Sequence, residues 1–128
     1  IEPKEYPLDA CLREVREETG FRLPTARFGG LITSQENNPA RGGVYLYSSP
    51  APHGNPAACN EGILQWHTKE WVFSSPEVAQ NIHIFGPPLL NHDHPRHYSF
   101  QYRNQRVLKY EVKPLPQWIT HFINVSQI

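Results

Sequence analysis

The first apolar stripe of the chain lies near its N-terminus. Apolar side chains recur there at i, i+3, i+4 and i+7, and they are Leu8, Cys11, Leu12 and Val15. This spacing is typical of an amphipathic α-helix. Thr19 continues the stripe less apolarly, and Gly20 supplies a stop because glycine readily adopts the left-handed conformation that ends helices. The pattern predicts a helix over residues 8–19 that packs through this stripe.

Short runs of β-branched and aromatic residues predict strands further along the chain. Such runs occupy residues 26–33, 44–47 and 63–66. The segment 35–43 between the first two runs is a predicted loop. Residues 49–60 contain three prolines and a glycine, too many breakers for a central strand, so they predict a surface loop.

The pattern of the C-terminal half is mixed. Residues 68–72 and 76–80 predict short helical pieces. The apolar run 82–85 fits either a helix or a strand, and Pro87 and Pro88 are expected to end it.

Two strand-like runs then predict a hairpin. They cover residues 98–102 and 106–112, and the polar segment 103–105 connects them. From Pro114 onward the apolar residues stand at partly helical spacing, which favours a terminal helix.

The composition is typical of a single globular domain. A chain of 128 residues fits one domain, and its 12 basic residues balance its 12 acidic ones, so no net charge favours nucleic acid or an anionic membrane. The two cysteines, Cys11 and Cys59, suggest neither a disulfide framework nor a zinc site. No apolar run approaches the roughly 18 residues of a membrane span, and residues 1–15 do not resemble a signal peptide. We therefore expect a cytoplasmic protein that binds neither nucleic acid nor membrane.

The segment with the clearest chemistry lies on the predicted helix. Glu14, Glu17 and Glu18 stand at i, i+3 and i+4, which places three carboxylates on one helical face beside the apolar stripe. Such neighbours repel one another by about 0.2 to 0.5 kcal/mol per pair, and a divalent cation would relieve that repulsion. Mg²⁺ suits these oxygen ligands, and Mn²⁺ is an alternative. The competing interpretation is a solvated, glutamate-rich helix face.

These residues carry a resemblance to the Nudix hydrolases. The family motif runs Gly, five residues, Glu, seven residues, then Arg-Glu-apolar-any-Glu-Glu-any-Gly-apolar. Every fixed position from Glu5 to Phe21 agrees with it, including Arg13 and the apolar Val15. The leading glycine of the motif would fall two places before Ile1, and the strand that precedes the motif is also missing from the sequence. We expect either a truncated sequence or an impaired fragment, with a Nudix domain over residues 1–113 and a tail over 114–128.

The resemblance implies roles for individual residues. Glu14, Glu17 and Glu18 would bind the metal, Glu14 could activate the attacking water, and Arg13 would orient these carboxylates. An ordinary surface ion pair of Arg13 with Glu17 is compatible with that role. Glu61, before an apolar run that ends in a tryptophan, resembles the loop glutamate that supplies a distant metal ligand or the base. Its alternative is an exposed loop acid.

The second half of the chain resembles the oxidised-purine nucleoside triphosphate diphosphatases of this family. Those enzymes read the base with an acidic pair before an aromatic residue and a proline. The pair is absent here, and Asn81 and Ile82 occupy its place, with Phe85 as the expected stacking ring. The amide of Asn81 could pair with a purine edge, or it could cap a helix.

The sequence therefore predicts an α/β sandwich of the Nudix type, with a mixed sheet flanked by helices. The expected activity is Mg²⁺-dependent hydrolysis of a purine nucleoside triphosphate, with the monophosphate and pyrophosphate as products and a small-molecule nucleotide as the substrate. The alternatives are ADP-ribose or nucleotide-sugar hydrolysis, and a Nudix fold that binds without cleaving. The motif His92-Asp93-His94 with His97 could bind a transition metal, but a polar exposed turn is the simpler interpretation.

Overall fold

The computed structural model describes residues 5–34, 43–57 and 63–123. Its first element, helix α1 (Pro7–Thr19), confirms the predicted helix. Proline at its first turn costs no hydrogen bond, and Gly20 ends the helix with a φ of 81° while its N–H donates to the carbonyl of Arg16. The predicted stop at this glycine is therefore confirmed.

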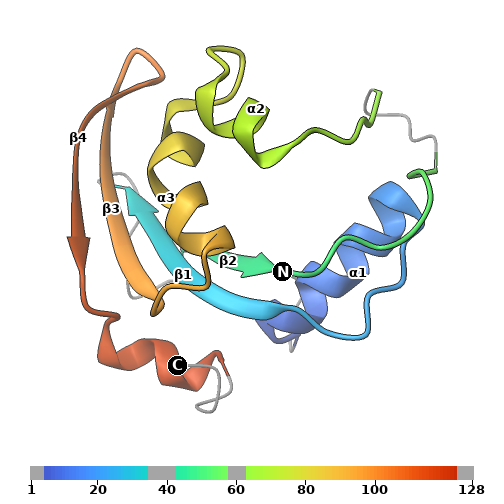
Figure 1. Cartoon of the computed structure of the whole chain (residues 1–128). Helices are drawn as coiled ribbons and strands as arrows, with labels where there is room; N and C mark the ends of the chain where they lie inside the picture. The colour runs from blue at the N-terminus through green and yellow to red at the C-terminus, as the bar shows by residue number, and fades with distance from the viewer. Residues whose placement is uncertain (1–4, 35–42, 58–62, 124–128) are drawn as a thin grey trace.

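The apolar stripe of α1 is less buried than its pattern predicted. Pro7 and Ala10 are the buried residues of the helix, whereas the predicted stripe residues are only partly buried. The reason is the position of α1, which lies beside strand β2 (Val44–Ser48) at one end of the molecule (Figure 1). A cavity of about 360 Å³ separates Cys11 and Val15 from Tyr45 and Tyr47, so contact along the stripe is incomplete.

A mixed sheet forms the middle layer, as expected. Its order is β2, β1 (Arg27–Ser34), β3 (Arg96–Arg103), β4 (Arg106–Lys113). Strands β1 and β3 are parallel, and both outer pairs are antiparallel. The interior of β1 is buried throughout, which is typical of a strand covered on both faces. The strands predicted at residues 26–33, 44–47, 98–102 and 106–112 are confirmed.

Helix α3 (Gln80–Leu90) covers one face of the sheet (Figure 1). It packs Ile84, Phe85 and Leu89 onto a cluster formed by Ile32, Leu46, Tyr98 and Phe100. Gly29 of β1 permits the close approach, because a Cβ there would stand 2.0 Å from Leu89 Cδ1. The sheet and the helix are therefore in direct contact at this glycine.

The expectation that Pro87 and Pro88 end this segment is wrong, because α3 continues through both to Leu90. Each proline removes one backbone donor from the helix. The helix persists because its apolar side chains Ile84, Phe85 and Leu89 pack, partly buried, against the sheet cluster.

Two further local predictions are wrong. Residues 63–66 form no strand, because they lie away from the sheet: Ile63 is 90% exposed, and the Trp66 indole donates to the carbonyl of Gly54 instead. Residues 76–79 form a turn, in which the Ser75 hydroxyl accepts from the N–H of Glu77. The predicted helical piece at 68–72 is confirmed as α2 (Lys69–Ser74), which Thr68 caps.

The C-terminal elements complete the sheet and cover its second face. The hairpin between β3 and β4 turns at Asn104 and Gln105, whose positive φ angles suit a tight two-residue connection. The terminal segment forms a short 3₁₀ helix, η2 (Gln117–His121), rather than an α-helix. It buries Ile119 against Phe28 and Leu31, on the face of the sheet opposite α3. The expected α/β sandwich with a mixed sheet is confirmed.

Candidate active site on helix α1

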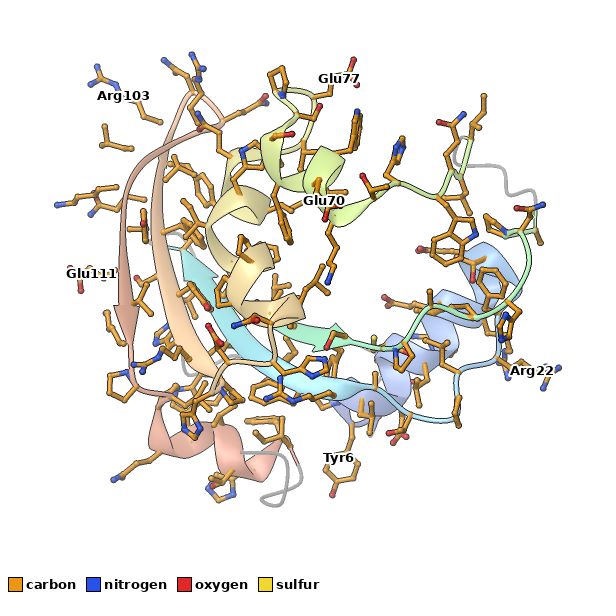
Figure 2. The ribbon with its side chains drawn as sticks, in the orientation of Figure 1. Tyr6, Arg22, Glu70, Glu77, Arg103 and Glu111 are labelled. Carbon is orange, nitrogen blue, oxygen red and sulfur yellow. The ribbon has the colours of Figure 1, made fainter. Side chains whose placement is uncertain are left out.

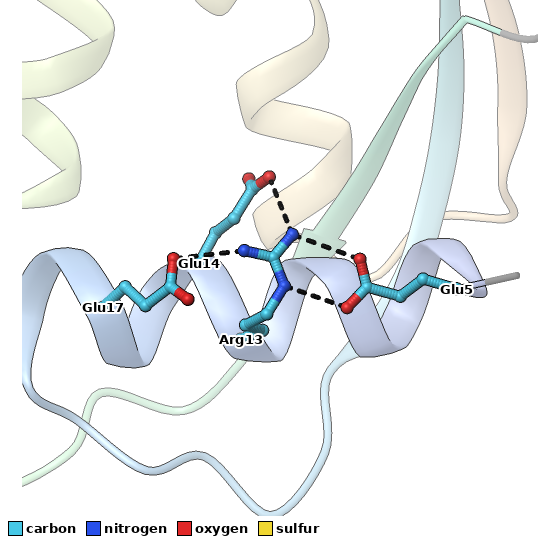
Figure 3. A network of polar contacts seen from close by, with 4 residues as sticks. All are labelled: Glu5, Arg13, Glu14 and Glu17. Atoms are coloured by element: carbon cyan, nitrogen blue, oxygen red, sulfur yellow. Dashed lines mark hydrogen bonds and ion pairs between the residues drawn. The ribbon is translucent and has the colours of Figure 1, made fainter. Parts of the chain in front are cut away.

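Arg13 holds the acidic face of α1 together (Figure 3). Its guanidinium donates to both carboxylate oxygens of Glu5, with Nε–Oε2 and Nη2–Oε1 distances of 2.9 Å and 3.1 Å. Nη1 donates to Glu17 at 3.1 Å, and Nη2 lies 3.7 Å from Glu14 Oε1. One planar cation therefore contacts three carboxylates, a geometry for which arginine is better suited than lysine.

The carboxylates differ in their exposure to solvent. The side chain of Glu5 is 16% exposed beneath the arginine, whereas those of Glu14 and Glu17 are 53% and 55% exposed. Glu18 is also exposed. The outer three acids can therefore reach a ligand from solvent, while Glu5 supports Arg13 from below.

The donor chemistry of this face fits a hard divalent cation. Carboxylate oxygens are the ligands that Mg²⁺ and Mn²⁺ accept. The four acidic residues of α1 outnumber its two arginines, so negative charge remains in excess. Within the described ranges, no three His, Cys, Asp or Glu side chains are gathered into a group able to hold a metal ion. Exposed glutamates change rotamer within nanoseconds, so Glu14, Glu17 and Glu18 can rearrange around an incoming cation.

Glu61, the fourth expected acid, lies outside the described residues. The chain that leads to it is anchored at the C-terminal end of α1. There the N–H of Ala57 donates to the carbonyl of Thr19 at 2.7 Å, and the Thr19 hydroxyl donates to the carbonyl of Val15 at 2.6 Å. The proline-rich loop is thus attached to the helix that carries the acids.

A large cleft opens beside the same end of α1. Its volume is about 680 Å³, and Val15 and Thr19 belong to its lining. Two aromatic rings, those of Phe21 and Trp66, also line it, with centroids 5.9 Å apart. This volume lies within the range of small-molecule sites. No sequence pattern predicted this cleft, because it forms between the end of α1 and an irregular segment.

The two expected base-reading residues lie elsewhere, on α3. Asn81 Nδ2 donates to the hydroxyl of Tyr102 at 3.3 Å. Phe85 is partly buried, with its ring in an edge contact with Tyr98 at 6.4 Å. These residues stand at i and i+4, so the helix brings them to one face, but neither lines the large cleft.

The cysteine and histidine side chains test two alternatives, covalent catalysis and transition-metal binding. The thiol pKa of Cys11 is raised by burial and by the negative charge of Glu14, which disfavours the thiolate that covalent catalysis requires. His92 and His94 lie in an exposed turn, as the simpler interpretation predicted. His97 does not belong to that turn: it is buried in β3, and its Nε2 lies 2.6 Å from the hydroxyl of Thr33.

The paired contact between Glu5 and Arg13 was not predicted from the sequence. The signal for it was the eight-residue separation within the motif, but Glu5 precedes the helix, so helical spacing alone could not place it against Arg13. No helix among the described residues is long and apolar enough to cross a membrane.

A comparison with known protein families identifies the family of this region of the chain. The family described as the NUDIX domain matches residues 1–92. The matched region includes α1 with its acids, the cleft-lining segments, and α3 with Asn81 and Phe85.

Proposed function

This chain belongs to the Nudix family of hydrolases, which act on small nucleotides with a diphosphate linkage, and we propose that its substrate is a purine nucleoside triphosphate, oxidised purines included. The products would be the nucleoside monophosphate and pyrophosphate. The observation that carries this proposal is the set of carboxylates around Arg13 on α1, because an acidic face can meet a polyanionic substrate only through a cation.

Members of this family generally use a divalent metal cation. We infer that the ion here is Mg²⁺, with Mn²⁺ as a substitute, and that Glu14, Glu17, Glu18 and Glu61 hold it. When bound, such an ion neutralises the diphosphate and lowers the pKa of a bound water. Arg13 supports the site by restraining the side chains of Glu14 and Glu17. The two carboxylates therefore lose less conformational entropy when they bind a ligand.

The hydrolytic step requires an acceptor for one proton. Water attacks phosphorus, the bond from phosphorus to the bridging oxygen breaks, and a carboxylate takes the proton of the water. Glu61 is the proposed acceptor, and Glu14 is the alternative. Ala57 is bonded at the end of α1, and the four residues from there to Glu61 can extend at most about 14 Å. This length of chain supports the proposal that Glu61 acts at the acidic face.

The nucleoside is assigned to α3. Asn81 and Phe85 share one face of that helix, and the amide of Asn81 donates a hydrogen bond to the hydroxyl of Tyr102 on strand β3. We propose that Asn81 reads the purine edge and that Phe85 contributes stacking. The cleft lined by Phe21 and Trp66 is the second candidate position for the base.

The proposed metal site can be tested by measuring Mn²⁺ binding. Mn²⁺ binding, followed by electron paramagnetic resonance, should weaken at least about tenfold in Glu17→Gln plus Glu18→Gln, because two charged ligands are removed. Glu77→Gln, at an exposed acid remote from α1 (Figure 2), should bind as the wild type does. Equal Mn²⁺ affinity in all three proteins would contradict the metal assignment.

The substrate class can be tested by comparing hydrolysis rates of the wild-type protein with different nucleotides. With Mg²⁺, the wild-type protein should release pyrophosphate from purine nucleoside triphosphates with a higher kcat/KM than it shows for ADP-ribose or a nucleotide sugar. A chelator should abolish the release. A preference for ADP-ribose would leave the metal site standing and overturn the substrate class.

A further inference from the structure

Strand β4 forms one edge of the sheet. Among the described strands it pairs only with β3, and it is the outermost strand of the molecule (Figure 1). Seven of its eight residues are exposed. An edge strand presents a row of backbone donors and acceptors that can pair with another strand.

The two faces of β4 differ in chemistry. Tyr110 and Val112 lie on the same face as their partners Phe100 and Tyr98, which is the face covered by α3. Tyr110 is 48% exposed and Val112 is 46% exposed, so this apolar face continues past the edge of the helix layer. Leu108, at the irregularity of the β3–β4 pairing, adds a side chain that is 59% exposed.

The opposite face of β4 carries charge. Lys109 and Glu111 stand opposite Gln101 and Ser99 of β3, and Glu111 also pairs with Lys113 at 3.7 Å. Glu111 points away from the body of the molecule (Figure 2). Charges of both signs thus alternate along one face, with apolar side chains on the other.

We propose that β4 is a homodimer interface, in which two copies of this chain join their β4 strands in antiparallel register about a two-fold axis at Tyr110. In this register Lys109 of each copy faces Glu111 of the other, and Tyr110 faces Tyr110. Leu108 faces Val112 on the apolar side. A two-fold interface must complement itself, and this strand does so in both charge and hydrophobicity.

The neighbouring registers are less favourable. Centring the axis on Lys109 sets two lysines opposite each other, and centring it on Glu111 sets two glutamates opposite each other. An axis at Val112 matches Glu111 with Lys113, but it brings Pro114, which has no N–H, into the ladder opposite Tyr110. The register at Tyr110 pairs opposite charges and leaves Pro114 at the very end of the ladder, opposite Arg106.

Charge reversal tests both the interface and its register. The mass of the wild type in solution, by sedimentation equilibrium, should approach twice the 14.8 kDa of the chain as concentration rises. Lys109→Glu should raise the dimer dissociation constant about tenfold or more, because two attractive pairs become repulsive. Glu111→Lys should do the same. The double variant, Lys109→Glu plus Glu111→Lys, restores both pairs and should restore the dimer.

Lys113→Glu is the matched control. Lys113 would face Val107 of the second copy, so its reversal should leave the dissociation constant within about twofold of the wild-type value. A wild-type protein that stays monomeric up to millimolar concentration would overturn the proposal. A dimer that Lys113→Glu breaks and Lys109→Glu does not would overturn the register. A double variant that fails to recover, although its circular dichroism matches the wild type, would overturn the pairing of Lys109 with Glu111.

Discussion

Arg13 illustrates how one residue organises a site without adding much stability. Its partners Glu14 and Glu17 are more than half exposed, and ion pairs at such positions contribute about 0 to 1 kcal/mol. The paired contact with the shielded Glu5 instead fixes the orientation of the guanidinium. The contribution of Arg13 is therefore geometric: it limits where the outer carboxylates can lie.

At the same scale, the proton acceptor can be identified by substitution. Glu61→Gln should lower kcat by roughly 10² to 10⁴ with a smaller change in KM, because a lost general base affects the transition state more than substrate binding. Steady-state hydrolysis by the full-length protein measures both constants. Glu70→Gln, at an exposed acid of α2, should leave both unchanged. Near-normal kcat in Glu61→Gln would make Glu61 a surface acid and transfer the role to Glu14.

At the scale of elements, prediction succeeded where the signal was local. Helix α1 and the hairpin around Asn104 were predictable because capping, periodicity and turn residues all lie within a few positions of one another. The same holds for the ion pair of Arg13 with Glu17, which follows from i, i+4 spacing.

Prediction failed where tertiary contacts decide. The prolines of α3 are tolerated because Leu89 and Phe85 pack on the sheet, a fact that no local pattern contains. Residues 63–66 have strand-forming side chains but lie away from the sheet, so they remain irregular. The cleft beside α1 was missed for a related reason, since Phe21 and Trp66 are 45 positions apart in the sequence.

The purine base has two candidate positions, α3 and the cleft beside α1. Matched substitutions at Phe85 and Trp66 distinguish between them. Phe85→Leu should raise KM for purine nucleoside triphosphates about tenfold, because stacking on an aromatic ring contributes roughly 1 to 3 kcal/mol. Leucine keeps most of the apolar contact with the sheet cluster, and thermal unfolding would verify that the fold is retained. Trp66→Leu should leave KM nearly unchanged. The reverse result would place the base in the cleft beside α1 and contradict the assignment to α3.

At the scale of the whole molecule, the sheet separates two apolar clusters. One contains Ile32 and Phe100 under α3, and the other contains Phe28 of the sheet with Ile119 of η2. The buried pair of Thr33 and His97 links the two central strands, β1 and β3. Protonation of His97 therefore bears on the stability of the whole sheet.

The pKa of His97 is lowered, first by burial and then by the positive charge of Lys113. The folded state therefore resists protonation more than the unfolded state does. Stability is fully present above the unfolded pKa, near 6.5, and declines as pH falls from there toward the lower folded pKa. The free energy of unfolding in urea should thus decrease as the pH falls below about 6.5.

Substitution of His97 tests whether this residue is the source of that decrease. His97→Gln should flatten the pH dependence across this window, since glutamine keeps a polar end group near Thr33 but does not titrate. The variant will be less stable than the wild type at neutral pH, so the slope with pH, rather than the absolute free energy, is the quantity to compare. His94→Gln, at an exposed position of the preceding turn, should keep the wild-type slope. If the unfolding free energy of His97→Gln still falls with pH as steeply as that of the wild type, other titratable groups cause the acid sensitivity. Protonation of His97 would then have no effect on how the pair with Thr33 stabilises β1 and β3.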